Sequence, residues 1–305
     1  MNTPDLSIII ISYNRPDDML ELAKNISELD YLDLLAEVIV VNNHSSVSYE
    51  GVERFIQDNS AIPFRYFQME ENLGVSKGRN YAIQQSNAAI LVFLDDDALF
   101  QNKDALLQVN NIFSEANKNG RKTGIAAFKV YYHSTFELQR NAFPHKQFNQ
   151  MKTLSHFDTY YFAGCAHTIR KEVFQNVGYY PENFFYGMEE YDLSYRTINA
   201  GYKIIYDDRV TVLHKESPFG RLTNKEKLRG MWVNKATVAW KYLPVQYFYS
   251  TSLLWSFQYL KETLRFNGWI KGWQQIFKIP GNEKRHPLHK ECITYLQKVK
   301  ARLWY

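Results

Sequence analysis

Short apolar runs alternate with helical patterns along the first hundred residues. Four runs bounded by polar residues predict strands at Leu6 to Ser12, Glu37 to Val41, Phe64 to Gln68 and Ala88 to Leu94. Helical patterns run from Pro16, a residue tolerated in a first helical turn, to about Ile26 and from about Ser76 to Gln85. Strands that alternate with helices favour βαβ crossovers, so we expect an α/β fold with a Rossmann-like, mostly parallel sheet flanked by helices.

The middle of the chain has a less regular pattern. Its predicted elements are, in order, a strand at Ile125 to Tyr132, a loop at Arg140 to Ser155, a strand at Tyr160 to Ile169, a helix at Leu193 to Ala200 closed by Gly201, and strands at Lys203 to Tyr206 and Val210 to Leu213. Beyond Phe219 the composition becomes basic and aromatic with helical spacing. This change predicts a helical C-terminal extension.

Polar clusters follow three of the predicted strands. They are Ser12-Tyr13-Asn14-Arg15, Asn42-Asn43-His44-Ser45 and Asp95-Asp96-Asp97. Ligands of open parallel sheets collect at the carboxyl ends of the strands, where these clusters fall. Three carboxylates at the end of a buried strand repel one another, and a hard divalent cation such as Mg²⁺, shared with substrate phosphates, removes that repulsion. The aspartates therefore predict a metal-phosphate site, with a solvated acidic turn as the alternative.

A second acidic cluster, Glu189, Glu190 and Asp192, opens a predicted helix. The helix dipole favours carboxylates at this position, so a capping role explains any one of them. Two adjacent carboxylates can also supply a general base that accepts a proton from an attacking hydroxyl. His214 ends a predicted strand, and it becomes a metal ligand only if the fold brings it to the three aspartates; otherwise it is a surface or hydrogen-bonded histidine.

The segment from Glu71 to Asn80 is a glycine-bearing loop that enters a helix. Its backbone amides and the guanidinium of Arg79 suit a phosphate or a nucleotide. The spacing matches neither a P-loop nor a dinucleotide fingerprint, so the motif by itself does not name the ligand.

Charge and cysteine usage add to this picture. The chain has 305 residues and a net charge of +4, but residues 221–305 carry +12 and the remainder −8, which suggests two parts with different partners. Two cysteines far apart, Cys165 and Cys292, form no disulfide framework or metal-knuckle spacing, which favours a reducing compartment. The N-terminus has no basic segment, and the apolar run from Ser7 to Ile11 is too short for a signal sequence, so we expect a cytoplasmic protein.

These motifs together resemble the family 2 glycosyltransferases of the GT-A fold over roughly residues 5 to 216, in the family's motif order. The matching segments are the opening strand and turn Ser7 to Arg15, Val40 to Ser45, the Asn-x-Gly helix start with Asn72, Gly74 and Arg79, the Asp-x-Asp element Phe93 to Asp97, the acidic catalytic segment Phe184 to Arg196, and Val212 to His214. Two departures stand out. The family usually has Asp where Asn42 stands, and Glu-Asp-x-Asp where this chain has Glu189-Glu190-Tyr191-Asp192.

The resemblance implies a role for each matching residue. Asp95, Asp97 and His214 would hold Mg²⁺ or Mn²⁺ on the donor diphosphate, and Asp96 or Asp95 would touch the ribose. Glu190, or its neighbour Glu189, would deprotonate the acceptor hydroxyl for inverting attack. The remaining nucleotide-sugar contacts would come from Ser12, Tyr13, Asn14, Arg15, Asn42, Asn72, Gly74 and Arg79.

We therefore expect a glycosyltransferase domain at residues 1–220, with a nucleotide-binding half at about 1–100 and an acceptor half at about 101–220, followed by a helical extension at 221–305. The expected activity is transfer from a nucleotide-diphosphate sugar, UDP-linked, to a hydroxyl of a glycan or lipid-linked acceptor in surface-glycan synthesis. Two alternatives are a sugar-nucleotide pyrophosphorylase and a non-catalytic subunit that binds a nucleotide sugar or a lipid. A pyrophosphorylase usually opens with a Gly-rich loop bearing Arg or Lys, which is absent between Ser12 and Asp18.

The extension leaves several partners open. No charged residue occurs from Tyr242 to Leu260, a stretch long enough to span a bilayer but diluted by polar residues. The alternatives are a transmembrane helix, an interfacial helix at the inner face of the membrane, and packing on the catalytic domain or another subunit in a homo-oligomer. Basic and aromatic residues together, such as Trp269, Lys271 and Trp273, suit an anionic membrane surface. No nucleic-acid-binding motif occurs, so we expect no nucleic-acid partner.

Overall fold

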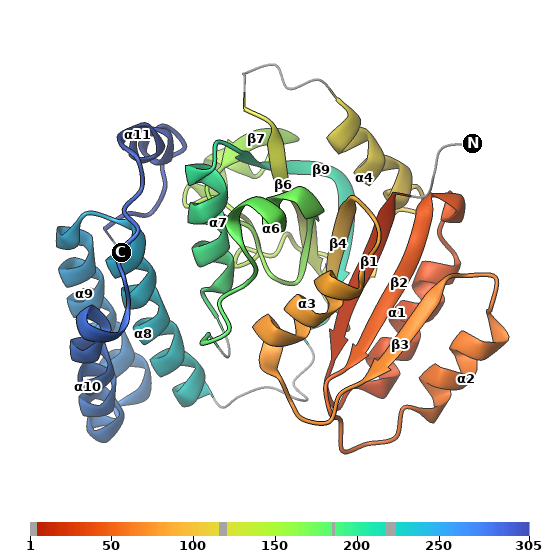
Figure 1. The fold of residues 1–305 in the computed structure, drawn as a ribbon, viewed down its shortest axis with the longest axis horizontal. Coiled ribbons are helices and arrows are strands. Elements are labelled where there is room, and N and C mark those ends of the chain that lie inside the picture. Colours follow the sequence, from red (N-terminus) through yellow and green to blue (C-terminus); the bar gives the residue numbers. More distant parts are fainter. Residues whose placement is uncertain (1–4, 116–120, 185–186, 217–223, 305) are drawn as a thin grey trace.

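The computed structural model describes residues 5–115, 121–184, 187–216 and 224–304. Its centre is a nine-stranded sheet in the order β3-β2-β1-β4-β8-β6-β9-β5, with β7 paired to β9 (Figure 1). The strands are β1 (Leu6–Ser12), β2 (Leu35–Asn42), β3 (Phe64–Gln68), β4 (Ile90–Asp95), β5 (Ala98–Phe100), β6 (Thr123–Tyr132), β7 (His156–Thr159), β8 (Ala166–Arg170) and β9 (Lys203–His214).

Helices cover both faces of the sheet. They are α1 (Pro16–Ser27), α2 (Glu50–Asp58), α3 (Gly74–Gln85), α4 (Ala105–Ser114), α5 (Phe148–Met151), α6 (Lys171–Val177), α7 (Glu189–Asn199), α8 (Asn224–Tyr242), α9 (Val245–Thr263), α10 (Phe266–Asn282) and α11 (Lys290–Lys298), with a 3₁₀ turn, η1, at Leu32–Leu34. Alternate residues of β1 enter different cores, because successive side chains of a strand point to opposite faces. Ile9 packs in the core shared with α3 and α7, and Ile8 and Ile10 pack in the core shared with α1 and α4.

The sheet is parallel where the strand–helix alternation predicted it. β3, β2, β1 and β4 pair in parallel, and their first and last residues agree closely with the sequence prediction. The second half is mixed, since β8 runs antiparallel to both β4 and β6, while β5 and β7 run antiparallel to β9. The α/β fold with a sheet flanked by helices is thus confirmed.

Several local predictions in the second half were wrong. The strand expected from Tyr160 begins only at Ala166, because the aromatic residues before it are buried in loop conformation. The two short strands expected after Gly201 form one strand, β9. Between the two expected strands, Asp207 is held within β9 by pairing with His156 of β7 and by a salt bridge to Arg209. The short helix α5 interrupts the expected loop.

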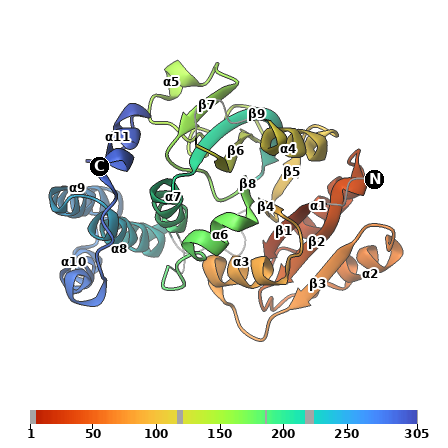
Figure 2. The same ribbon diagram turned by 45° about the horizontal axis from the view of Figure 1, so that its top comes forward.

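The C-terminal extension packs against α7. Figures 1 and 2 show α8, α9 and α10 lying together beside α7. Asp192 of α7 accepts hydrogen bonds from Lys241 Nζ at 2.6 Å and from the Tyr242 hydroxyl at 2.8 Å. Trp232 is fully buried in the core that also contains Ile9. The two regions therefore share one hydrophobic core, and the expected boundary at residues 220–221 lies outside the described residues.

In the described part of the chain, no helix is long and apolar enough to cross a bilayer.

Candidate active site

A cavity of about 600 Å³ opens at the carboxyl ends of the parallel strands. Of the residues predicted to form the site, nine line it: Tyr13, Arg15, Asn72, Gly74, Arg79, Asp95, Glu189, Glu190 and His214. The fold therefore brings Asp95 and His214, the candidate bases and part of the nucleotide-contacting set to the wall of one cavity. Ser12, Asn14, Asn42, Asp96 and Asp97 do not line the cavity. Ser12 and Asn42 are the last residues of β1 and β2, and the other three lie in the turns that follow β1 and β4.

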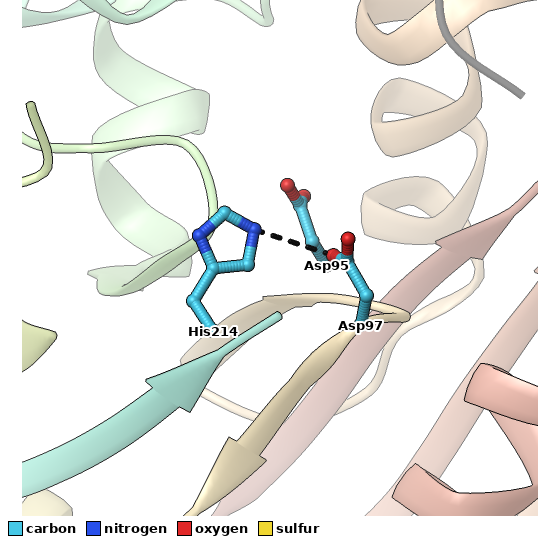
Figure 3. A group of neighbouring side chains, drawn as sticks. All are labelled: Asp95, Asp97 and His214. Atoms are coloured by element: carbon cyan, nitrogen blue, oxygen red, sulfur yellow. Dashed lines mark ion pairs between the residues drawn. The ribbon is translucent and has the colours of Figure 1, made fainter. Parts of the chain in front are cut away.

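His214 and the aspartates meet because two strands pair. β5 follows the aspartate turn directly and runs antiparallel to the end of β9, with Ala98 opposite His214. His214 Nε2 consequently lies 3.3 Å from Asp97 Oδ1 (Figure 3). One ligand atom from each of Asp95, Asp97 and His214 can be chosen so that all three lie within 4.8 Å of one another.

The ring of His214 is oriented by a second residue. Its Nδ1 lies 3.0 Å from Gln139 Oε1, which accepts the Nδ1 proton, and the Gln139 amide donates to Glu216 Oε1 at 2.8 Å. This arrangement directs Nε2, a buried atom without a well-aligned hydrogen bond, toward the carboxylates. Burial lowers the pKa of His214, but Cys165 and the Asp97 carboxylate outweigh it and raise the pKa to about 11.

The donor set of this cluster fits a divalent cation. Two carboxylate oxygens and one imidazole nitrogen are ligands that Mg²⁺ or Mn²⁺ accepts, and the cavity beside them leaves room for substrate oxygens. A bound cation would displace the proton on His214, since metal binding requires the neutral ring.

Asp96 has a different environment from its two neighbours. Its side chain is fully buried, accepts a 2.6 Å hydrogen bond from the Ser12 hydroxyl and pairs with Arg15 at 2.8 Å. Burial raises its pKa to about 7, although Arg15 acts in the opposite direction. Arg15 also pairs with Asp97 at 2.8 Å, so Ser12 and Arg15 hold the aspartate turn in place. Between the two residues suggested for ribose contact, only Asp95 lines the cavity.

Glu189 and Glu190 start α7 on the other side of the cavity. The side chain of Glu190 is 16% exposed and that of Glu189 is 3% exposed, so Glu190 is the more accessible carboxylate. Burial raises the pKa of both, and Arg79 opposes this rise. Gly164 lies so close that a Cβ at that position would overlap the Glu190 carboxylate. The backbone glycine therefore leaves room for the candidate base.

Arg79 links the two acidic groups. It is buried on α3, and its guanidinium lies 3.3 Å from Asp95, 3.6 Å from Glu189 and 3.7 Å from Glu190. It also donates to the Gly164 carbonyl at 2.8 Å. One fixed cation thus stabilises carboxylates on both sides of the cavity.

The loop before α3 is braced by asparagines. Asn72 Oδ1 accepts from the Gly74 amide at 2.9 Å, and Asn43 Oδ1 accepts from the Leu73 amide at 2.9 Å. Gly74 has a φ of 72°, a left-handed conformation that glycine adopts without strain. The glycine-bearing segment before α3 is therefore a turn that places Asn72 and Gly74 on the cavity wall.

Asn42 and Asn14 have side chains engaged in the neighbouring turn. Asn42 donates to the Tyr66 hydroxyl at 2.7 Å and accepts from the Ser45 amide at 3.0 Å. Asn14 accepts from the Ser46 amide at 2.7 Å. Both residues shape the loop after β2.

Sequence reasoning missed several residues that line the cavity, among them Gln139, Tyr161 and Gly164. No motif spacing marks Gln139 or Gly164. Tyr191 belongs to the acidic segment, but the sequence prediction gave it no role. Its position directly after Glu190 could have indicated that it lines the cavity.

A family model, Glycosyl transferase family 2, matches residues 7–178 of this chain. The chain belongs to the family 2 glycosyltransferases. The matched residues include the three aspartates and Arg79 and end before Glu190 and His214. In the tertiary structure, Glu190 and His214 line the candidate site of this glycosyltransferase together with Asp95 and Arg79.

Individual relatives agree with this assignment. The glycosyltransferase is 26% identical over 245 residues to Glycosyltransferase AglE of Haloferax volcanii, a match covering 73% of this chain and 71% of the relative. It is 28% identical over 148 residues to the O-antigen chain rhamnosyltransferase WbaN of Salmonella anatum, covering 46% of this chain and 45% of that one.

A solved structure shows the same fold. The crystal structure of GalNAc-T7 with UDP, GalNAc and Mn²⁺ is similar with a TM-score of 0.65 and 17% identity, over 99% of this chain and 59% of that longer chain. The glycosyltransferase thus has the GT-A fold expected from its motifs.

Proposed function

We propose that this glycosyltransferase is a metal-dependent inverting enzyme. It moves a sugar from a nucleotide-diphosphate sugar, UDP-linked, to a hydroxyl of a glycan or lipid-linked acceptor. The observation that carries the proposal is the placement of Glu190 and the Asp95–Asp97–His214 cluster around one cavity, with Arg79 between them.

The donor is proposed to bind along the β1, β4 and α3 side of this cavity. Asp95, Asp97 and His214 would hold Mg²⁺ or Mn²⁺, and such a cation would neutralise negative charge on the leaving diphosphate. Tyr13 and Asn72 line the wall beside this cluster and are placed to contact the nucleotide. The uracil contact of Asn42 stays a prediction and would use the second lone pair of its Oδ1.

Glu190 is the proposed general base. Its carboxylate faces the cavity, and its raised pKa suits acceptance of a proton from an acceptor hydroxyl near neutral pH. Glu189 is more deeply buried, and we assign it the supporting role of raising the pKa of Glu190. Direct attack by the activated hydroxyl on the anomeric carbon gives inversion without a covalent enzyme intermediate.

Turnover of the donor tests this function. Hydrolysis and transfer from a panel of UDP- and GDP-sugars should require Mn²⁺ or Mg²⁺, and Asp97→Asn and Glu190→Gln should each lose most of the activity. Glu50→Gln, at an exposed position on α2, is the matched control and should match the wild type. Full activity of either site variant would refute the assignment, and exchange of pyrophosphate into a nucleoside triphosphate would support the pyrophosphorylase alternative.

The extension is proposed to contact an anionic membrane surface peripherally. Large apolar side chains on α9 and α10 are exposed, including Phe257 at 60% and Phe277 at 76%, and Lys271 and Lys278 lie on the same helix as Phe277. Such pairing of exposed aromatic and basic residues fits an acidic lipid surface. Flotation with phosphatidylglycerol vesicles but not with pure phosphatidylcholine vesicles, weakened in a Phe257→Ser/Phe277→Ser variant, is the expected result. Equal recovery of the protein in the floated fraction with both kinds of vesicle would contradict the membrane contact. A homo-oligomer detected by light scattering would instead assign this surface to contact with a second copy of the chain.

A further inference from the structure

A second, smaller cavity opens beside the catalytic one. Its volume is about 230 Å³, and Asn141, Tyr161 and Tyr191 line both cavities. Tyr191 directly follows the proposed base Glu190 in the chain. The small cavity is therefore the continuation of the catalytic cavity on the side of the proposed base, and it lacks the three aspartates that define the donor side.

Three cationic side chains line this small cavity, and no carboxylate does. They are Arg140, Lys146 and Arg302, and all three belong to exposed residues. Among the residues that the structure describes, none of the three makes an ion pair with a carboxylate. The contacts that the structure shows are those of Lys146 Nζ with the Ala301 carbonyl at 3.4 Å and of the Arg140 guanidinium with the Phe148 ring, 5.7 Å from its centroid. Three cations without an acidic partner create a positive potential that favours an anion.

The backbone that carries Arg302 is anchored in the fold. Arg302 lies between Ala301 and Leu303, which are 6% and 7% exposed, so the chain on both sides of it is buried. The Ala301 amide donates to the Leu296 carbonyl at 2.8 Å. Figure 2 shows this end of the chain beside α8 and α11. The C-terminal extension thus contributes a cation to a cavity built mainly by the acceptor half.

The aromatic wall of the cavity is rigid. The rings of Tyr161 and Tyr191 stack with centroids 4.8 Å apart and planes 12° apart, and the Tyr161 hydroxyl donates to the Phe143 carbonyl at 2.9 Å. A flat aromatic wall shared by both cavities suits the apolar face of a sugar ring.

We propose that this cavity is an acceptor subsite that binds a sugar bearing an oxyanion, a phosphate or a carboxylate. The inference rests on the proposed function, since it names the acceptor class of the same site. Arginine presents a fork of donors that matches phosphate and carboxylate oxygens, and two arginines and a lysine surround a volume suited to one sugar residue and smaller than most ligand pockets. The anion has two possible sources, a substituent on the acceptor sugar or the phosphate that joins that sugar to a carrier.

Binding of simple probes to the metal-free, donor-free protein tests the subsite. Calorimetry would compare glucose 6-phosphate, glucose 1-phosphate, glucuronate and inorganic phosphate with neutral methyl glucoside. We expect the charged sugars to bind at least about tenfold more tightly than methyl glucoside, as one charge-assisted contact allows. Preference for the 6-phosphate or glucuronate indicates a ring substituent, and preference for the 1-phosphate indicates a carrier phosphate.

Variants locate the binding and separate it from the proposed function. Arg302→Gln and Arg140→Gln should each weaken charged-sugar binding about tenfold and leave methyl glucoside binding unchanged. Arg54→Gln removes an exposed arginine on α2 and should bind all probes as the wild type does. Equal binding of charged and neutral sugars, failure of every anionic probe to bind, or unchanged binding by both cavity variants would overturn the subsite. These binding experiments contain no donor, so they test the subsite alone. Failure of the wild type to turn over any donor would refute the transferase mechanism and would leave the binding result unaffected.

Discussion

Arg79 Nη1 lies 3.7 Å from the Oε1 of Glu190, and the other terminal nitrogen of the same guanidinium lies 3.3 Å from Asp95. A single buried arginine therefore connects the proposed base with the proposed metal site. Its charge limits the rise in pKa that burial imposes on Glu190. We therefore expect any change at Arg79 to affect both carboxylates.

Glu190→Gln should lower kcat by roughly 10²–10⁴-fold, the usual contribution of a positioned general base. The amide keeps the shape of the side chain but cannot accept the proton. The measurement is transfer in the presence of Mn²⁺, with donor affinity measured separately by calorimetry. Loss of donor binding in place of loss of kcat would assign Glu190 to the donor side.

The pH profile should report the environment of the glutamate pair. Burial first, and then the neighbouring Glu189, raise the pKa of Glu190, so the active carboxylate is lost as pH falls through values above the ordinary glutamate range. Glu189→Gln removes the neighbouring charge and should move the acidic limb of kcat/KM to lower pH. An acidic limb that stays in place in this variant would show that another group controls it.

Gly164→Ala should lower kcat by about 10²-fold while the protein stays folded. The added Cβ would overlap the Glu190 carboxylate and displace it, and a displacement of about 1 Å is enough to cost this factor. Gly51→Ala is a suitable control, because the nearest atom to its added Cβ is 3.9 Å away. Wild-type activity of Gly164→Ala would mean that Glu190 moves freely during turnover.

Gln139→Leu should weaken Mn²⁺ binding by about 10–100-fold, the cost typical of removing the residue that orients a metal-ligating histidine. The substitution removes the acceptor at 3.0 Å from His214 Nδ1. Mn²⁺ affinity from electron paramagnetic resonance gives the answer without turnover, and urea unfolding checks the fold. Unchanged affinity in a folded variant would exclude His214 as a ligand oriented in this way.

Trp232→Ala should destabilise the whole protein by about 3–5 kcal/mol, the range for truncating a large buried aromatic. The indole is fully buried within the extension, where it packs on Tyr259 of α9 and Trp273 of α10, and its Nε1 donates to the Ser252 carbonyl at 2.9 Å. Because both regions share one core, urea unfolding followed by tryptophan fluorescence and by circular dichroism should shift together. Two separate transitions would show that the extension unfolds on its own.

Local pattern was sufficient for the strands of the first hundred residues. The boundaries of β1 and β3 agree with the sequence prediction residue for residue, because each is a short β-branched or aromatic run between polar residues. The same reasoning placed Asp95 at the end of a buried strand, where its charge requires a partner. These features depend on residues that are neighbours in the chain.

The tertiary structure decided which distant residues complete the site. His214 reaches Asp97 only because β5 pairs with β9, and Gln139 reaches His214 from a loop that has no periodic signal. The greater exposure of Glu190 over Glu189 depends on how α7 packs. Arg302, near the end of the chain, lines the small cavity beside the proposed base. Local periodicity cannot encode such contacts, because they arise from strand order and from the packing of separate elements in one core.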